Sequence, residues 1–263
     1  MYISIAYKPT LMPTSAPFYL DWTFWAATWA LLAIVLSQLP PVHLLLRPKR
    51  LEVEVHSRIG ITHKVGNSNA SIVVSLRNTG GRELRIRSLS LDIARDSKPH
   101  LVLPGQTYFE LPSSLSSVLF VPFSLKPGET WTHSVAFLNH FDRLTEKQFR
   151  ENLSALDADI KRKLRNRPQE DNEAVAVEPA LVSPFNTMFD KLFAWLPGEY
   201  VANLKVDAQP GSASYTKKYR FTLYESDTAE LRKHVEDYPF GGGLSFNLEH
   251  HREVFVPLTE HVG

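Results

Sequence analysis

Hydrophobic and polar residues follow different patterns along this chain, and each pattern predicts a different kind of structure. From Trp22 to Leu39 the residues are mostly apolar on every side of a helix, and none is charged. As an α-helix this run would be about 27 Å long, close to the ~30 Å hydrocarbon thickness of a bilayer. Pro40 and Pro41 end such a helix, because proline lacks an amide donor. We therefore predict a transmembrane helix and juxtamembrane segment over residues 22–46, after a short tail over residues 1–21.

The predicted span carries bulky and small residues at helical spacing. Its tryptophans are three and four residues apart, so they share one face and resemble an interfacial aromatic belt. Two alanines four residues apart form a small-xxx-small pair, which lets a second helix approach closely. The predicted partners are therefore the lipid bilayer and a protein partner or second copy bound through this helix. The residues of the predicted span are Trp22, Trp25, Ala26, Trp29, Ala30 and Leu36.

Two other interpretations of this run are a cleaved signal peptide and a buried core helix. Only Lys8 precedes the run, and the run is long and rich in tryptophan, which disfavours a cleaved signal peptide. Apolar residues on all sides, rather than in a stripe, disfavour a core helix. Arg47, Lys49 and Arg50 follow at once, so the positive-inside rule predicts a cytoplasmic C-terminal domain. The alternative places this domain outside the cytoplasm as a ligand- or surface-binding module.

From Leu51 onward the hydrophobic pattern has a period of two, which is typical of half-buried strands. Leu51, Val53 and Val55 alternate with polar residues. A slip of the hydrophobic phase at Ser88 predicts a β-bulge or a bend. Short strands without β–α alternation predict an antiparallel sandwich or barrel. Besides the first, the predicted strands are 71–77, 84–93, 118–125, 130–138, 200–208 and 217–224.

Three segments resemble the immunoglobulin-like and fibronectin-type β-sandwiches. They are LRNTGGRELRIRSLSL (76–91), LKPGETWTHSVAF (125–137) and LPGEYVANLKV (196–206). In the last one, Tyr200 and Ala202 sit like the Tyr-x-Cys of an immunoglobulin strand F, with alanine in place of the cysteine. The resemblance implies an immunoglobulin-like antiparallel β-sandwich over residues 51–226, in which Tyr200 makes a tyrosine corner. It implies no particular function, because this fold hosts many unrelated roles.

The strand pattern is interrupted by a predicted helical insertion over residues 141–197. Apolar residues recur every three or four positions over 142–165, and a second, aromatic-rich helix follows at 183–196. One interpretation packs the aromatic helix over an open end of the sandwich. The other makes it a second membrane or partner contact, aided by the basic run 161–167. The residues of that contact are Lys161, Arg162, Lys163, Phe185, Phe189, Phe193 and Trp195. Residues 227–263 add a C-terminal helix and an edge segment.

Composition limits the chemistry that we expect. The 29 Lys and Arg residues balance 28 Asp and Glu residues, which argues against a nucleic-acid binder. The chain has no cysteine, so it has no disulfide and no thiolate metal ligand. No phosphate-binding loop, dinucleotide fingerprint or HExxH motif is present. The one dense group of metal-ligand side chains is Glu249, His250, His251 and Glu253, which leaves a metal-dependent hydrolase as an alternative.

Together these patterns predict a non-enzymatic protein without a cofactor. We expect a single-pass, membrane-anchored β-sandwich that acts as a binding or scaffolding subunit of a membrane-associated complex.

Overall fold

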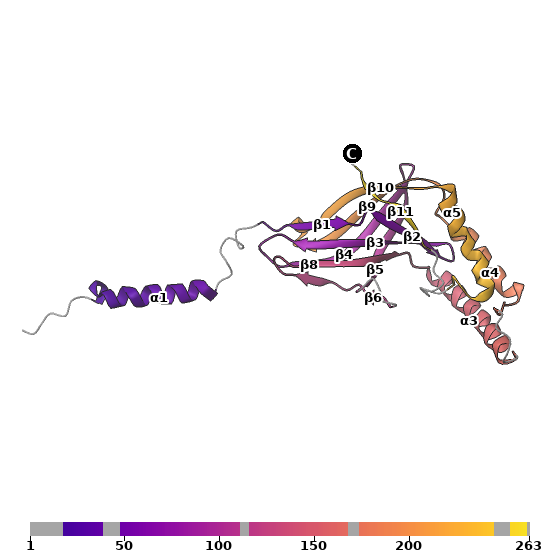
Figure 1. Cartoon of the computed structure of the whole chain (residues 1–263), viewed down its shortest axis with the longest axis horizontal. Coiled ribbons are helices and arrows are strands. Elements are labelled where there is room, and N and C mark those ends of the chain that lie inside the picture. Colours follow the sequence, from indigo (N-terminus) through magenta and orange to yellow (C-terminus); the bar gives the residue numbers. More distant parts are fainter. Residues whose placement is uncertain (1–17, 39–47, 111–115, 168–173, 245–252, 262–263) are drawn as a thin grey trace, which may run out of the picture. The chain divides into compact units, whose positions relative to one another are not determined.

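The computed structural model describes residues 18–38, 48–110, 116–167, 174–244 and 253–261. The chain divides into two compact units, Met1–Leu46 and Arg47–Gly263. Figure 1 shows the elements of both units.

The first unit holds a short 3-10 helix, η1 (Phe18–Leu20), and the helix α1 (Trp22–Gln38). Asp21 begins α1, since its Oδ1 accepts a hydrogen bond from the amide of Thr23 at 3.0 Å. With 17 residues, α1 is about 25 Å long, which is shorter than a ~30 Å hydrocarbon layer. No helix in the described ranges is both long enough and apolar enough to cross a membrane. The predicted transmembrane helix is therefore wrong.

In its described residues, the second unit is built around twelve antiparallel strands. Their bounds are β1 (Leu51–Val55), β2 (Arg58–Lys64), β3 (Asn67–Asn78), β4 (Leu84–Arg95), β5 (Lys98–Phe109), β6 (Val118–Leu119), β7 (Phe123–Leu125), β8 (Thr130–Leu138), β9 (Gly198–Gln209), β10 (Tyr215–Leu223), β11 (Val254–Pro257) and β12 (Thr259–Glu260). All of them belong to one sheet with the order β11-β2-β3-β8-β5-β4-β9-β10-β12, while β1 pairs with β3, β6 with β5 and β7 with β4.

This sheet closes almost completely on itself, which corrects the predicted fold class of an immunoglobulin-like β-sandwich. Two segments join what would be separate sheets in a sandwich. The first part of β5 pairs with β4, and its second part, from Gly105 onward, pairs with β8. At the other side, the C-terminal segment pairs with β2 through β11 and with β10 through β12. The domain is therefore mainly β, with a single, nearly closed antiparallel sheet.

The hydrophobic alternation places the core inside this sheet. Leu84, Ile86, Leu89, Leu91 and Ile93 are all buried along β4, although the first two lie in one phase and the others in the opposite phase. The pairing of β4 with β9 shifts between Ile86 and Ser88, and this irregularity lets both phases point inward. The β-bulge predicted at this position is confirmed.

Helices pack at the end of the sheet where the β2–β3 turn lies. They are α3 (Arg143–Arg165), α4 (Pro179–Leu192), α5 (Glu225–Arg232) and the 3-10 helix η3 (Lys233–Phe240); a further turn, η2 (Gly211–Ala213), precedes β10. Asp142 begins α3 by accepting from the amides of Leu144 and Thr145. A second hydrophobic core lies among α3, α4, η3 and Val65 of the β2–β3 turn. Helices α3 and α4 thus lie between β8 and β9 in the chain, and they share this core with η3 and Val65.

Gly66 makes the close approach between the β2–β3 turn and α4 possible. Its φ of +81° favours glycine, and a Cβ added there would lie 2.7 Å from the carbonyl oxygen of Phe189. A side chain at this position would therefore push α4 away from the sheet.

Candidate functional site

The residues predicted to contact a membrane through α1 all lie on an uncovered helix. Trp22 is 81 % exposed and Trp29 is 64 % exposed, and Ala26 and Ala30 are exposed as well. A helix inside a globular core hides its apolar side chains, but every described side chain of α1 is exposed. The large apolar side chains exposed on α1 are Trp22, Phe24, Trp25, Trp29, Leu31, Leu32, Ile34, Val35 and Leu36.

Several polar groups of the first unit are satisfied without water. The Thr28 hydroxyl donates to the carbonyl of Phe24 at 2.8 Å, and the Ser37 hydroxyl donates to the carbonyl of Ile34 at 2.7 Å. The indole of Trp25 donates to the carbonyl of Tyr19 at 2.8 Å. Because these groups already have partners, moving α1 into an apolar medium leaves none of them unpaired.

The aromatic residues predicted as a second membrane or partner contact lie mainly inside the domain. Phe185 and Trp195 have no exposed surface, Phe189 is 3 % exposed and Phe193 is half-buried. The indole of Trp195 donates to the backbone carbonyl of Thr62 at 2.8 Å, which ties the insertion to β2. The structure thus has the arrangement of the first interpretation, in which the aromatic helix packs over one end of the sheet.

A buried histidine pair joins β2 to the segment formed by α5 and η3. The His63 ring accepts from the amide of Gly66 at its Nδ1, 3.0 Å away, so its Nε2 carries the proton donated to the carbonyl of Leu231. The His234 ring packs on it with a centroid distance of 4.5 Å. The Arg232 guanidinium lies 4.7 Å from the ring centroid of Phe193. These contacts join β2 to α5 and η3, and join α5 to Phe193, the residue that follows α4.

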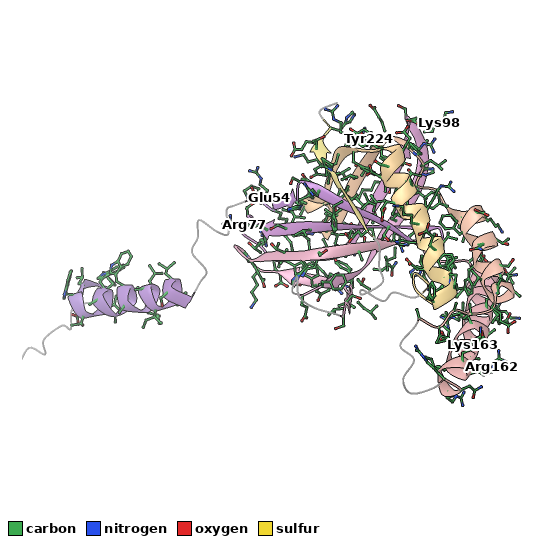
Figure 2. The ribbon with its side chains drawn as sticks, turned by 45° about the vertical axis from the view of Figure 1, so that its right-hand side comes forward. Glu54, Arg77, Lys98, Arg162, Lys163 and Tyr224 are labelled. Carbon is green, nitrogen blue, oxygen red and sulfur yellow. The ribbon has the colours of Figure 1, made fainter. Side chains whose placement is uncertain are left out.

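The basic residues predicted to contact lipid are partly used within the insertion. Arg162 and Lys163 project from the last turns of α3 (Figure 2) and both pair with Asp159, Lys163 at 3.1 Å. The hydrogen bond from Arg162 lowers the pKa of the Asp159 carboxyl. The other oxygen of this carboxyl accepts from the amide of Glu178 at 3.3 Å, at the start of α4. Lys161 is exposed.

The residues predicted to set the topology lie at the start of the second unit. Arg47 lies outside the described residues. Lys49 is half-buried and Arg50 is exposed, and the Arg50 carbonyl accepts from the amide of Thr79 at 3.0 Å. The side of a membrane on which the domain lies stays a prediction.

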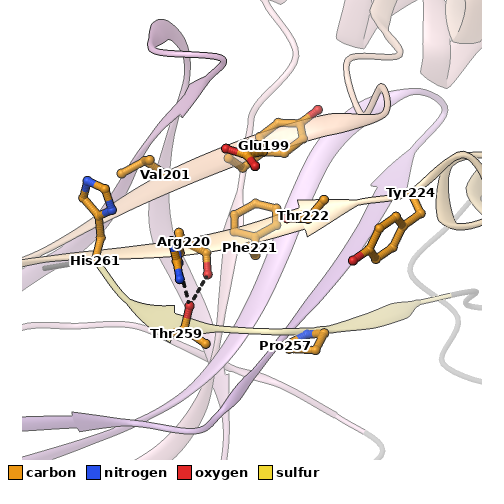
Figure 3. A pocket seen from close by; sticks show the side chains of 10 residues that line it. Glu199, Val201, Arg220, Phe221, Thr222, Tyr224, Pro257, Thr259 and His261 are labelled. Atoms are coloured by element: carbon orange, nitrogen blue, oxygen red, sulfur yellow. Dashed lines mark hydrogen bonds between the residues drawn. The ribbon is translucent and has the colours of Figure 1, made fainter.

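Two adjoining hollows mark the outer face of β9 and β10. One of about 440 Å³ is lined by Glu199, Arg220, Tyr224 and their neighbours, and Figure 3 shows these side chains. In it the Arg220 guanidinium donates to the hydroxyl of Thr259 at 3.3 Å. The second, of about 570 Å³, shares Val201 and His261 with the first.

Of the sequence cluster considered as a metal site, only the last residue lies within the described residues. Glu249, His250 and His251 lie outside the described residues, whereas Glu253 is half-buried and accepts from the hydroxyl of Ser71. Burial raises the pKa of the Glu253 carboxyl. Within the described ranges, no three His, Asp or Glu side chains lie close enough to hold a metal ion.

No protein-family model matches this chain, and no curated protein matches it. One feature of the immunoglobulin-like resemblance is present, because the Tyr200 hydroxyl donates to the carbonyl of Leu196 at 2.7 Å, four residues upstream. The domain is mainly antiparallel β, as the sheet topology shows. The comparisons give no support for membership of the immunoglobulin-like superfamily.

Proposed function

We propose that this chain is a non-enzymatic binding or scaffolding protein that attaches to a lipid bilayer through α1 and presents its β domain to a partner. The observation that carries the proposal is the exposure of apolar side chains on all sides of α1. Burying one large apolar side chain is worth roughly 1.5–3 kcal/mol, so α1 gains much free energy in any apolar medium.

A bilayer suits α1 better than a groove on one protein does. A protein groove covers one side of a helix, and helices that bind in grooves carry an apolar stripe with a polar opposite face. No such polar face exists on α1, whose sequence is WTFWAATWALLAIVLSQ. The small residues Ala26 and Ala30 leave room for a second helix to pack closely against α1.

The experiment is flotation of the full-length chain with phosphatidylcholine liposomes. Leu31 and Ile34 are exposed on α1, and changing both to aspartate places two charges on the apolar helix. We expect the wild-type chain and the matched Leu31→Ala/Ile34→Ala control to float, and the Leu31→Asp/Ile34→Asp variant to remain in the dense fraction. The proposal is wrong if the wild-type chain does not float, or if the aspartate variant floats equally well.

A further inference from the structure

The nearly closed sheet has an opening along β1. Strands β1 and β2 follow one another along the same side of β3. On the outer edge of β2 lies β11, and the amide of Leu258 then donates to the carbonyl of Ser57 at 2.8 Å. Beyond that point the C-terminal segment turns away and pairs with β10. Among the described residues, β1 therefore has β3 on one edge and no strand on the other.

The backbone groups along this free edge of β1 follow from the hydrogen bonds on its other edge. The amide of His56 donates to the carbonyl of Val73 at 3.0 Å, and the carbonyl of Arg50 accepts from Thr79 at 3.0 Å. Even-numbered residues therefore face β3, because hydrogen-bonding direction alternates along an antiparallel strand. The amides and carbonyls of Leu51, Val53 and Val55 point into the opening.

The opening is a groove of about 460 Å³ with an apolar floor and a charged rim. Val53, Tyr219 and Leu258 line the floor, and their side chains are buried. Glu52 and Glu54 line the rim, with Lys217 and Glu260 across from them. A strand that adds to this edge would alternate in the same way, with apolar residues over the floor and polar residues at the rim.

The rim is acidic. Lys217 is paired with Glu260, which raises the pKa of the Lys217 ammonium group. Glu52 lies opposite Arg77 in the β1–β3 register and Glu54 lies opposite Ser75. Neither glutamate forms an ion pair within the described ranges; Figure 2 labels Glu54 and Arg77. Charge complementarity therefore favours a strand whose outward residues are lysine or arginine.

We infer that this groove binds an extended segment of a protein partner by strand addition. The segment adds about five residues along Leu51–Val55 and alternates apolar with basic side chains. The inference rests on the proposed function, because it names the class of partner that the binding domain takes. It does not involve α1, so failure of strand binding and failure of membrane attachment are distinguishable.

The test adds a probe strand to the full-length chain. The sequence Lys-Val-Lys-Val-Lys is fused after Gly263 through about 12 Gly and Ser residues, which give a reach of roughly 20 Å. The tether also raises the effective concentration of the probe to roughly the millimolar range. The control fusion carries Lys-Pro-Lys-Pro-Lys, which keeps the charge and lacks the amides that a strand needs. Amide hydrogen exchange is followed at Leu51, Val53 and Val55, and liposome flotation is measured on the same samples.

We expect exchange at these three amides to slow by about tenfold or more in the valine fusion and to stay unchanged in the proline fusion. Reversing the charge of the rim with Glu52→Lys/Glu54→Lys should abolish this protection. Fusing a Glu-Val-Glu-Val-Glu tail to the same variant should restore it. Equal exchange in both fusions would overturn the inference, and the two glutamates would then only guard the edge against aggregation. Protection that ignores the charge reversal would overturn the basic character of the partner.

Discussion

The helices α1 and α4 are both rich in aromatic and aliphatic residues, yet α4 buries these side chains and α1 exposes them. Along α4, Phe185 and Phe189 are buried, whereas Trp22, Trp25 and Trp29 of α1 are exposed. Sequence composition suggested a membrane contact for both. The difference shows that apolar content alone does not decide whether a helix is buried within its own unit.

The matching surface for α4 comes from several elements. Phe149 of α3, Val65 of the β2–β3 turn and Tyr238 of η3 share its core. The Phe149 and Phe185 rings meet with centroids 5.9 Å apart. Helix α4 also carries a stripe, since Asp190 and Lys191 lie away from the buried residues. Helix α1 has no such stripe. Packing one of its faces against a protein surface would leave apolar side chains exposed on its other faces.

The largest expected effect comes from emptying the second core. Phe185→Ala should lower the free energy of unfolding of the β domain by about 3–5 kcal/mol, because it removes a fully buried ring and leaves a cavity. The matched change on the uncovered helix, Trp29→Ala, should leave that free energy within about 0.5 kcal/mol. Denaturant unfolding of the full chain in detergent measures both. Equal losses of unfolding free energy in the two variants would contradict the distinction between the buried α4 and the exposed α1.

A glycine pair isolates the contact between α4 and the sheet. Gly66 and Gly128 have φ values of +81° and +82°, but a Cβ meets the α4 backbone at Gly66 and nothing within 4 Å at Gly128. Gly128→Ala should therefore cost about 1–2 kcal/mol through backbone strain alone. Gly66→Ala should cost more and should also increase proteolysis of α4. If the two variants lose the same stability, the turn does not hold α4.

Glu253 should weaken the domain as pH rises. Burial raises the pKa of its carboxyl, so above the unfolded value near ~4.3 the unfolded chain releases a proton that the folded chain retains. Stability then falls until the folded pKa is passed. We expect Glu253→Gln to match the wild-type melting temperature near pH 4 and to exceed it at pH 7. A variant that is equally stable or less stable at pH 7 would contradict this account.

The Asp159 carboxyl, which contacts the start of α4, should stabilise the domain more as pH rises. The hydrogen bond from Arg162 lowers the pKa of its carboxyl, so its stabilisation is present above the unfolded pKa and is lost as pH falls through the folded one. Asp159→Asn should therefore lower the melting temperature at pH 7, and the difference from wild type should shrink towards pH 3. A difference that stays constant with pH would mean that the charge is unimportant.

Much of the fold was predictable from local patterns. The alternation in Leu51–Val55 and Thr130–Leu138 predicted β1 and β8 with their observed bounds, and the period over 142–165 predicted α3. The phase slip at Ser88 located the bulge. Each of these features depends on the pattern within one segment, where side-chain periodicity reports directly on burial.

Two strands and the closure of the sheet were not predictable in this way. In β2 the residues from Ile59 to His63 are buried in succession, so no alternation marks the strand. Pro99, Pro104 and Gly105 interrupt the pattern of β5, at the strand that passes from β4 to β8. Closure depends on the pairing of the C-terminal segment with β2 and β10, which are far from it in sequence. The fate of α4 likewise depends on distant partners such as Val65.

The central proposal is that α1 attaches the chain to a bilayer, while the aromatic insertion stays within the protein. The chain has five tryptophans, so two single-tryptophan proteins, one retaining Trp29 and one retaining Trp195, can be made by changing the other four to phenylalanine. Each is reconstituted with lipids brominated on their acyl chains, which quench fluorescence on contact. The account predicts strong quenching of Trp29 and none of Trp195. Unquenched Trp29 emission, or quenching of Trp195, would contradict it.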